Sequence, residues 1–155
     1  MLEWLESSPL ALFVQESPWG YPLILSAHAI GMAMLVGVVL MVNLRMLGFA
    51  PEMPLAPLAS MLKLALWGFA LNVVSGSLLF IADADGFFES TPFRIKAILL
   101  AAGVTLIALT WRRTLHPSEP ASASVPAVRL IALASILVWI GVIVAGRLIA
   151  YFKLF

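Results

Sequence analysis

The chain has 155 residues, of which 63% are hydrophobic and 11% are charged, whereas a soluble domain carries about 25% charged residues. This composition indicates one domain that faces lipid rather than water, and the net charge of +1 gives no reason to expect a nucleic-acid partner. The absence of cysteine excludes disulfides, thiol catalysis, iron–sulfur clusters and thiolate metal sites.

The first residues, MLEWLESSP, carry acids and no basic residue, so they do not have the pattern of a cleavable signal peptide. The first hydrophobic span is therefore expected to act as the insertion signal. Ser8 and Pro9, followed by LALFVQE, predict a short helix that lies along the membrane interface.

Four segments reach the length of roughly 20 apolar residues that a helix needs to cross a bilayer. Pro22 and Pro92 fall in first turns, where the missing N–H costs nothing, and Thr91 is the expected N-cap of the third span. We therefore predict an all-α integral membrane protein, a four-helix transmembrane bundle in a single domain over residues 1–155, with a short N-terminal interfacial helix. The spans are expected at about 22–47, 58–82, 92–111 and 127–152.

Charges are distributed unequally between the two ends of the predicted bundle. One end carries five cations, namely Arg45, Lys63, Arg112, Arg113 and Arg129. The other end has two cations outside the spans, Arg94 and Lys153, together with six acids: Glu3, Glu6, Glu16, Asp83, Asp85 and Glu89. Because cytoplasmic loops are enriched in Lys and Arg, this pattern predicts a bacterial inner-membrane protein with both termini periplasmic or extracellular.

One face of the second span is small and polar. It carries Ala65, Gly68, Asn72, Ser75, Gly76 and Leu79 at helical spacing. Helices in lipid associate through close backbone approach and buried polar contacts, so this face is expected to point into the bundle. Packing alone accounts for most of these small residues.

Three spans place an ionisable residue at nearly the same depth. His28, Lys96 and Arg147 lie roughly 9, 6 and 8 Å inside the outer ends of their helices at 1.5 Å per residue. An ionisable residue inside a membrane is costly and indicates a functional site. The alternative is that Lys96 and Arg147 extend separately to the headgroups, while His28 is a buried hydrogen-bonding residue, for example to Asn72.

Two cations and an imidazole suit an anionic ligand with a coordinating centre. Haem b is the leading candidate, with His28 as axial ligand and Lys96 and Arg147 at the propionates. Copper is the second, because His28 and Met32 are four residues apart on one face and suit Cu(I); a quinone or a lipid headgroup is the third. The other histidine, His116, is expected on the inner side, so two-histidine ligation would need a second chain or another ligand.

Several stretches carry a resemblance to known families. SGSLLFIADADGFFESTPFRIKAILLAAGVTLIALTWRR (75–113) resembles the core of the copper-resistance protein CopD domain, with Ser75–Gly76, Thr91–Pro92 and Lys96 in the same order. His28-x-x-Gly31 resembles the same superfamily and the four-helix haem-pathway protein HemJ. SPWGYP (17–22), HAIGMAMLVG (28–37), NLRMLG (43–48) and WIGVIVAGRLIAY (139–151) resemble an uncharacterised family of small four-helix bacterial membrane proteins. The CopD resemblance implies an inner-membrane bundle associated with copper or haem.

Three functions follow as hypotheses. The first is haem b binding near the periplasmic face for electron transfer or haem handling, and the second is copper transport or resistance. The third is a non-catalytic subunit of a larger membrane complex or homo-oligomer, in which the polar layer anchors headgroups or a partner. The sequence lacks an HExxH motif, a Gly-rich phosphate loop and a Ser/His/Asp grouping, so nothing supports hydrolysis, and whether the protein is an enzyme stays open.

Overall fold

The computed structural model describes residues 2–49, 51–52, 57, 61–115 and 125–152. Within these residues the chain forms helices and no strands, which confirms the all-α prediction. Four helices are long and apolar enough to span a membrane: α3 (Gly20–Leu47), α5 (Leu62–Ile81), α7 (Thr91–Leu115) and α8 (Val125–Phe152). Three shorter helices accompany them: α1 (Glu3–Glu6), α2 (Pro9–Glu16) and α6 (Ala84–Glu89).

The predicted spans agree with these helices apart from their ends. The third span continues to Leu115, and α3 begins two residues before Pro22. Residues 58–60, predicted to start the second span, lie outside the described residues, as do His116 and Lys153. The predicted cap at Thr91 is wrong: Thr91 is already helical, and the hydroxyl of Ser90 accepts a hydrogen bond from the Phe93 N–H at 3.4 Å.

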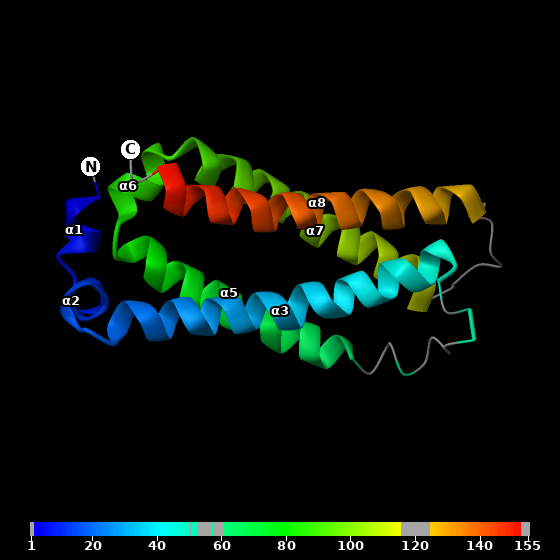
Figure 1. Cartoon of the computed structure of the whole chain (residues 1–155), viewed down its shortest axis with the longest axis horizontal. Coiled ribbons are helices and arrows are strands. Elements are labelled where there is room, and N and C mark those ends of the chain that lie inside the picture. The colour runs from blue at the N-terminus through cyan, green and yellow to red at the C-terminus, as the bar shows by residue number, and fades with distance from the viewer. Residues whose placement is uncertain (1, 50, 53–56, 58–60, 116–124, 153–155) are drawn as a thin grey trace.

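The long helices form two packed pairs that run the length of the molecule (Figure 1). α3 packs along α5, α7 packs along α8, and contacts between α3 and α8 join the pairs. The core at this junction contains Leu35, Val36, Val38, Val39, Ala65, Trp139 and Val142. Hydrophobic side chains elsewhere face outward, for example Trp67 at 73% exposure and Ile98 at 70%, as expected for a surface that contacts lipid.

The C-terminal end of helix α3 forms a Schellman motif. Gly48 has φ +102°, a left-handed conformation in which a side chain costs energy. Its N–H donates to the Arg45 carbonyl, and the Phe49 N–H donates to the Leu44 carbonyl. These two bonds satisfy carbonyls that the end of a helix would leave without partners.

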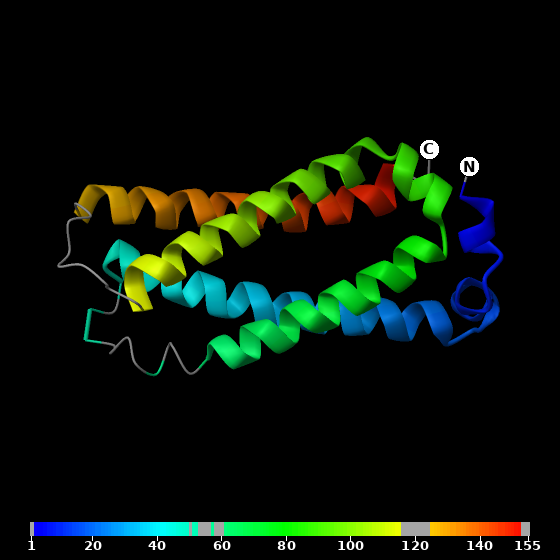
Figure 2. The same ribbon diagram turned by 180° about the vertical axis from the view of Figure 1, so that it is seen from behind.

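The three short helices cover one end of the bundle, the end at which both chain termini lie (Figures 1 and 2). The predicted N-terminal helix is present as α2, and the Ser8 hydroxyl caps it by accepting from the Ala11 N–H at 3.2 Å. The prediction placed this helix along the membrane interface. In the structure α2 also packs against α3 and α5, and its Ala11 and Val14 are almost completely buried. The helices α1 and α6 were not predicted.

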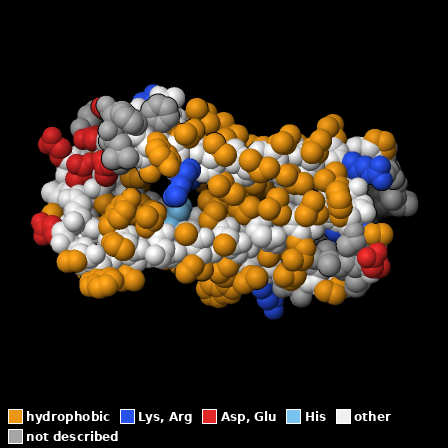
Figure 3. All heavy atoms as spheres, viewed as in Figure 1, with side chains coloured by type: hydrophobic (Ala, Val, Ile, Leu, Met, Phe, Trp, Pro, Cys, Tyr) orange, Lys and Arg blue, Asp and Glu red, His pale blue; other side chains and the backbone are white. Residues whose placement is uncertain are grey.

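Hydrogen bonds join the members of this helical cap, α1, α2 and α6, to one another and to the bundle. The Leu2 N–H donates to Asp85 Oδ1 at 3.1 Å, and the Asp85 N–H donates to Glu6 Oε1 at 3.0 Å. The Gln15 amide donates to the Ala82 carbonyl at 2.7 Å, which joins α2 to the end of α5. Most of the acidic residues lie at this end, where Figure 3 shows most of the red side chains.

An aromatic cluster holds the corner between α5, α6 and α7. The Phe80 and Phe93 rings stack with centroids 5.5 Å apart, and Phe87 meets Phe93 edge-on at 5.4 Å. Such pairs contribute about 0.5–1.5 kcal/mol beyond their buried area. The cluster fixes the direction in which α7 re-enters the bundle, and with it the position of Lys96.

Candidate functional site

The backbones of α3 and α5 touch at Gly31 and Gly68. A Cβ atom on Gly31 would lie 2.8 Å from the Gly68 carbonyl oxygen, and a Cβ on Gly68 would lie 2.8 Å from the Gly31 carbonyl oxygen. Only glycine permits this approach. Ala65, Gly68, Ser75 and Leu79 are buried, so the small face of the second span points inward as predicted.

This approach brings His28 of α3 against α5, less than one turn from Gly31. The imidazole Nδ1 lies 3.0 Å from the Ser75 hydroxyl oxygen. Asn72 donates its amide to the backbone carbonyl of His28 at 3.3 Å rather than to the ring. The predicted contact between His28 and Asn72 is therefore present through the backbone, and Ser75 is the partner of the imidazole.

The hydrogen-bond chain favours one tautomer of His28. The Ser75 hydroxyl has one hydrogen and donates it to the Leu71 carbonyl, one turn back in α5. Its oxygen is then the acceptor for Nδ1–H of His28. In this arrangement the neutral imidazole keeps its lone pair on Nε2. Ser75 and Leu71 thereby prepare His28 to accept a proton or to bind a metal.

Glycine makes room for the ring. A Cβ on Gly76 would lie 3.2 Å from Cε1 and 3.5 Å from Nδ1 of His28, a contact that would force the imidazole to move. Ser75 and Gly76 thus act together, one orienting the ring and the other leaving space beside it. From the sequence alone, Ser75 and Gly76 are explained by helix packing.

Lys96 approaches the same level from α7. Its Nζ lies 3.5 Å from the position of a Cβ on Gly146 in α8. Within the described part of the chain no hydrogen bond or ion pair neutralises the Lys96 ammonium. All four spans therefore contribute at one depth. Figure 3 shows the histidine, in pale blue, beside a basic side chain on an otherwise hydrophobic face.

The other two candidate residues, Arg147 and Met32, differ in their surroundings. Arg147 follows Gly146 directly, but its side chain is exposed on the outside of α8. Met32 packs against the buried core cluster, as a gap-filling methionine does. Among the described residues, no group of three His, Cys, Asp or Glu could hold a metal ion. His28 and Lys96 thus lie at one level of the bundle, Arg147 is exposed, and Met32, one turn from His28 in α3, packs against the core.

A second polar contact lies in the other half of the bundle. The Asn43 amide of α3 donates to the Ser135 hydroxyl of α8 at 2.8 Å, and both residues are 1% exposed. Nearby in α8, Trp139 is fully buried, and its indole lies against Gly103 of α7. These contacts hold helix pairs together, and the buried Trp139 indole N–H has no hydrogen-bond partner among the described residues.

Comparison with known proteins identifies a family but no activity. Neither the curated proteins nor the solved structures contain a match to this chain. The comparisons accordingly give no support to the resemblance to the CopD domain and HemJ. The match to an uncharacterised family is supported over residues 1–152. The chain belongs to the family of unknown function DUF6644.

Proposed function

We propose that this protein is a multi-pass membrane protein that binds haem b through His28, near the end of the bundle covered by α1, α2 and α6, for electron transfer or haem handling. The observation that carries the proposal is the hydrogen-bond chain from His28 Nδ1 through Ser75 to the Leu71 carbonyl. It leaves Nε2 available, and metal-ligating histidines characteristically donate their other ring N–H in this way.

The side chains around His28 suit a haem. A single imidazole is a known axial ligand of haem iron. Gly76 has no Cβ that would push the imidazole out of this orientation. Lys96 offers an ammonium without a carboxylate partner among the described residues, which suits a propionate. A bound haem would supply one-electron redox chemistry, and the protein would orient it and compensate its negative charge.

The test is the visible spectrum of the protein purified from haem-supplemented cells. We expect a Soret band that is lost in His28→Ala and kept in His116→Ala, the matched control at the other histidine. Ser75→Ala is expected to weaken haem affinity about 10- to 100-fold, as loss of an orienting partner does at other metal-bound histidines. A folded wild-type protein without a Soret band, or a His28→Ala variant that keeps it, would refute the proposal.

Lys96 provides a separate check on the ligand's charge. Lys96→Gln is expected to weaken haem retention, whereas Lys96→Arg keeps the positive charge and is expected to retain more haem than Lys96→Gln. Equal retention by the two variants would contradict an electrostatic role for Lys96. Arg147→Gln is the comparison at an exposed cation of similar depth, and the smaller effect is expected there.

Copper handling, or a non-catalytic role in a larger complex, is the alternative. Copper bound by His28 would need a further soft ligand, and the packing of Met32 against the core makes copper the less supported choice. Measurement of the iron and copper content of the same preparation distinguishes haem from copper. If the triple variant of His28, Lys96 and Arg147 has no phenotype and a partner co-purifies in stoichiometric amount, the subunit role gains the support.

We also propose the bacterial inner membrane as the location, with both termini on the periplasmic side. Most acids lie at the end covered by the helical cap, while Arg45, Lys63 and Arg129 belong to the opposite end of the bundle, in keeping with the positive-inside pattern. Alkaline phosphatase fused after Phe155 is expected to be active and green fluorescent protein at the same position dark. The reverse result would invert the orientation.

A further inference from the structure

A groove runs down the outside of α7 and α8. It has a volume of about 790 Å³ and begins at the end of α6. The described residues that line it include none of those assigned to the haem site, His28, Ser75, Gly76 and Lys96. The groove is therefore separate from the proposed haem site.

The lining of the groove changes with depth. Its mouth is polar, with Glu89, Ser90 and Thr91 at the junction of α6 and α7. Its walls are apolar and include Ile95, Val144 and Leu148. From Thr91 to Leu99 the groove follows α7 for about 12 Å at 1.5 Å per residue. A polar entrance at the membrane surface above an apolar channel along a membrane-spanning helix matches an amphiphile with its head at the surface.

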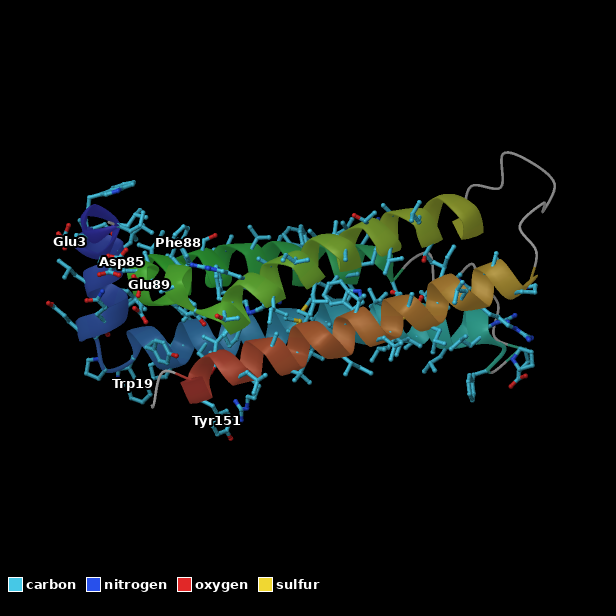
Figure 4. All side chains as sticks on the ribbon, turned by 90° about the horizontal axis from the view of Figure 1, so that it is seen from above. Glu3, Trp19, Asp85, Phe88, Glu89 and Tyr151 are labelled. Carbon is cyan, nitrogen blue, oxygen red and sulfur yellow. The ribbon has the colours of Figure 1, made fainter. Side chains whose placement is uncertain are left out.

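The charge at the mouth selects the head group. Among the described residues that line the groove, Glu89 is the only charged one, and its side chain is exposed. The nearest basic residue of α7, Arg94, is held elsewhere: its Nε donates to the Phe88 carbonyl at 3.0 Å, and its guanidinium lies 5.8 Å from the centre of the Phe88 ring. Figure 4 shows Glu89 at this end of the bundle. A negative mouth favours a cationic head group over an anionic one.

We infer that the groove binds one phospholipid with a primary amine head group, of the phosphatidylethanolamine type, from the leaflet at the α6 end. The ammonium contacts the Glu89 carboxylate, and the Ser90 and Thr91 hydroxyls are available to the phosphate. One acyl chain lies against Ile95, Val144 and Leu148. Phosphatidylglycerol has the same chains but brings a net negative charge beside Glu89, so it binds less well.

The experiment uses the full-length protein in vesicles of equal phosphatidylethanolamine and phosphatidylglycerol, followed by mild detergent extraction and native mass spectrometry. We expect one retained lipid, with phosphatidylethanolamine favoured about two- to fivefold, the factor that an exposed ion pair contributes. Glu89→Gln should remove the preference while retaining a lipid. Glu3→Gln, at an exposed acid of α1 outside the groove, is the matched control and should keep the preference.

A second pair of variants tests the groove itself. Val144→Trp fills the groove from an exposed position of α8, and Leu133→Trp adds the same ring at an exposed position of α8 outside it. Lipid retention should fall in the first and persist in the second. Equal retention of both lipids by the wild type, a preference for phosphatidylglycerol, or full retention by Val144→Trp overturns the inference. None of these outcomes depends on haem.

Discussion

Replacing Gly68 by alanine tests whether direct backbone contact between α3 and α5 supports the bundle. An alanine Cβ at this position would lie 2.8 Å from three atoms: the Gly31 carbonyl oxygen, the Leu35 amide nitrogen and the Met34 Cβ. Two of these belong to the backbone of α3, which cannot rotate away. The helices must therefore separate by several tenths of an ångström, and this also pulls Ser75 away from His28.

The expected loss follows from two opposing effects. Overpacking of a close contact costs about 1–3 kcal/mol, and a backbone clash belongs at the upper end. Alanine regains up to about 1 kcal/mol through its higher helix propensity. The free energy of unfolding should thus fall by about 2 kcal/mol in Gly68→Ala.

The matched control is Gly37→Ala. Gly37 also lies in a membrane span, but a Cβ there meets nothing within 4 Å. This variant gains propensity without a clash, so it should be as stable as the wild type or slightly more stable. Unfolding of the purified proteins in detergent, followed by circular dichroism, gives the comparison. Equal stability of Gly68→Ala and Gly37→Ala would refute the reasoning that α3 and α5 are in backbone contact.

Three smaller effects follow from single contacts. Asn43→Ala and Ser135→Ala should each lower the free energy of unfolding by about 1 kcal/mol in the same assay. Because both substitutions remove the same hydrogen bond, the double variant should lose less than the sum of the two. Full additivity would contradict a direct bond. Gly48→Ala should cost about 1–2 kcal/mol through its left-handed backbone, so a neutral result would argue against the Schellman end of α3. Ser8→Ala should lower the stability of α2 by about 1 kcal/mol and speed hydrogen exchange in α2 but not in α3; unchanged exchange would show that Ser8 is not the cap.

Hydrophobic length determined the transmembrane architecture. Each span must satisfy its own backbone hydrogen bonds in lipid, so long apolar segments are read directly as helices. The inward face of α5 was also predictable, since small residues at helical spacing mark a packing face. Helix ends were less predictable: Ser90 rather than Thr91 caps α7, because either neighbouring hydroxyl satisfies the same sequence pattern.

Tertiary structure decided what the depth of the polar residues could not. Depth placed His28, Lys96 and Arg147 at one level, but depth along a helix says nothing about the direction in which a side chain points. Packing laid Lys96 against Gly146 of α8 and left Arg147 exposed. The hydrogen bond from His28 to Ser75 arises from the contact between two glycines on different helices, and such a contact exists only once the helices have packed. The sequence by itself thus determined a four-span bundle with a polar layer, and the packing of the four helices decided which members of that layer meet.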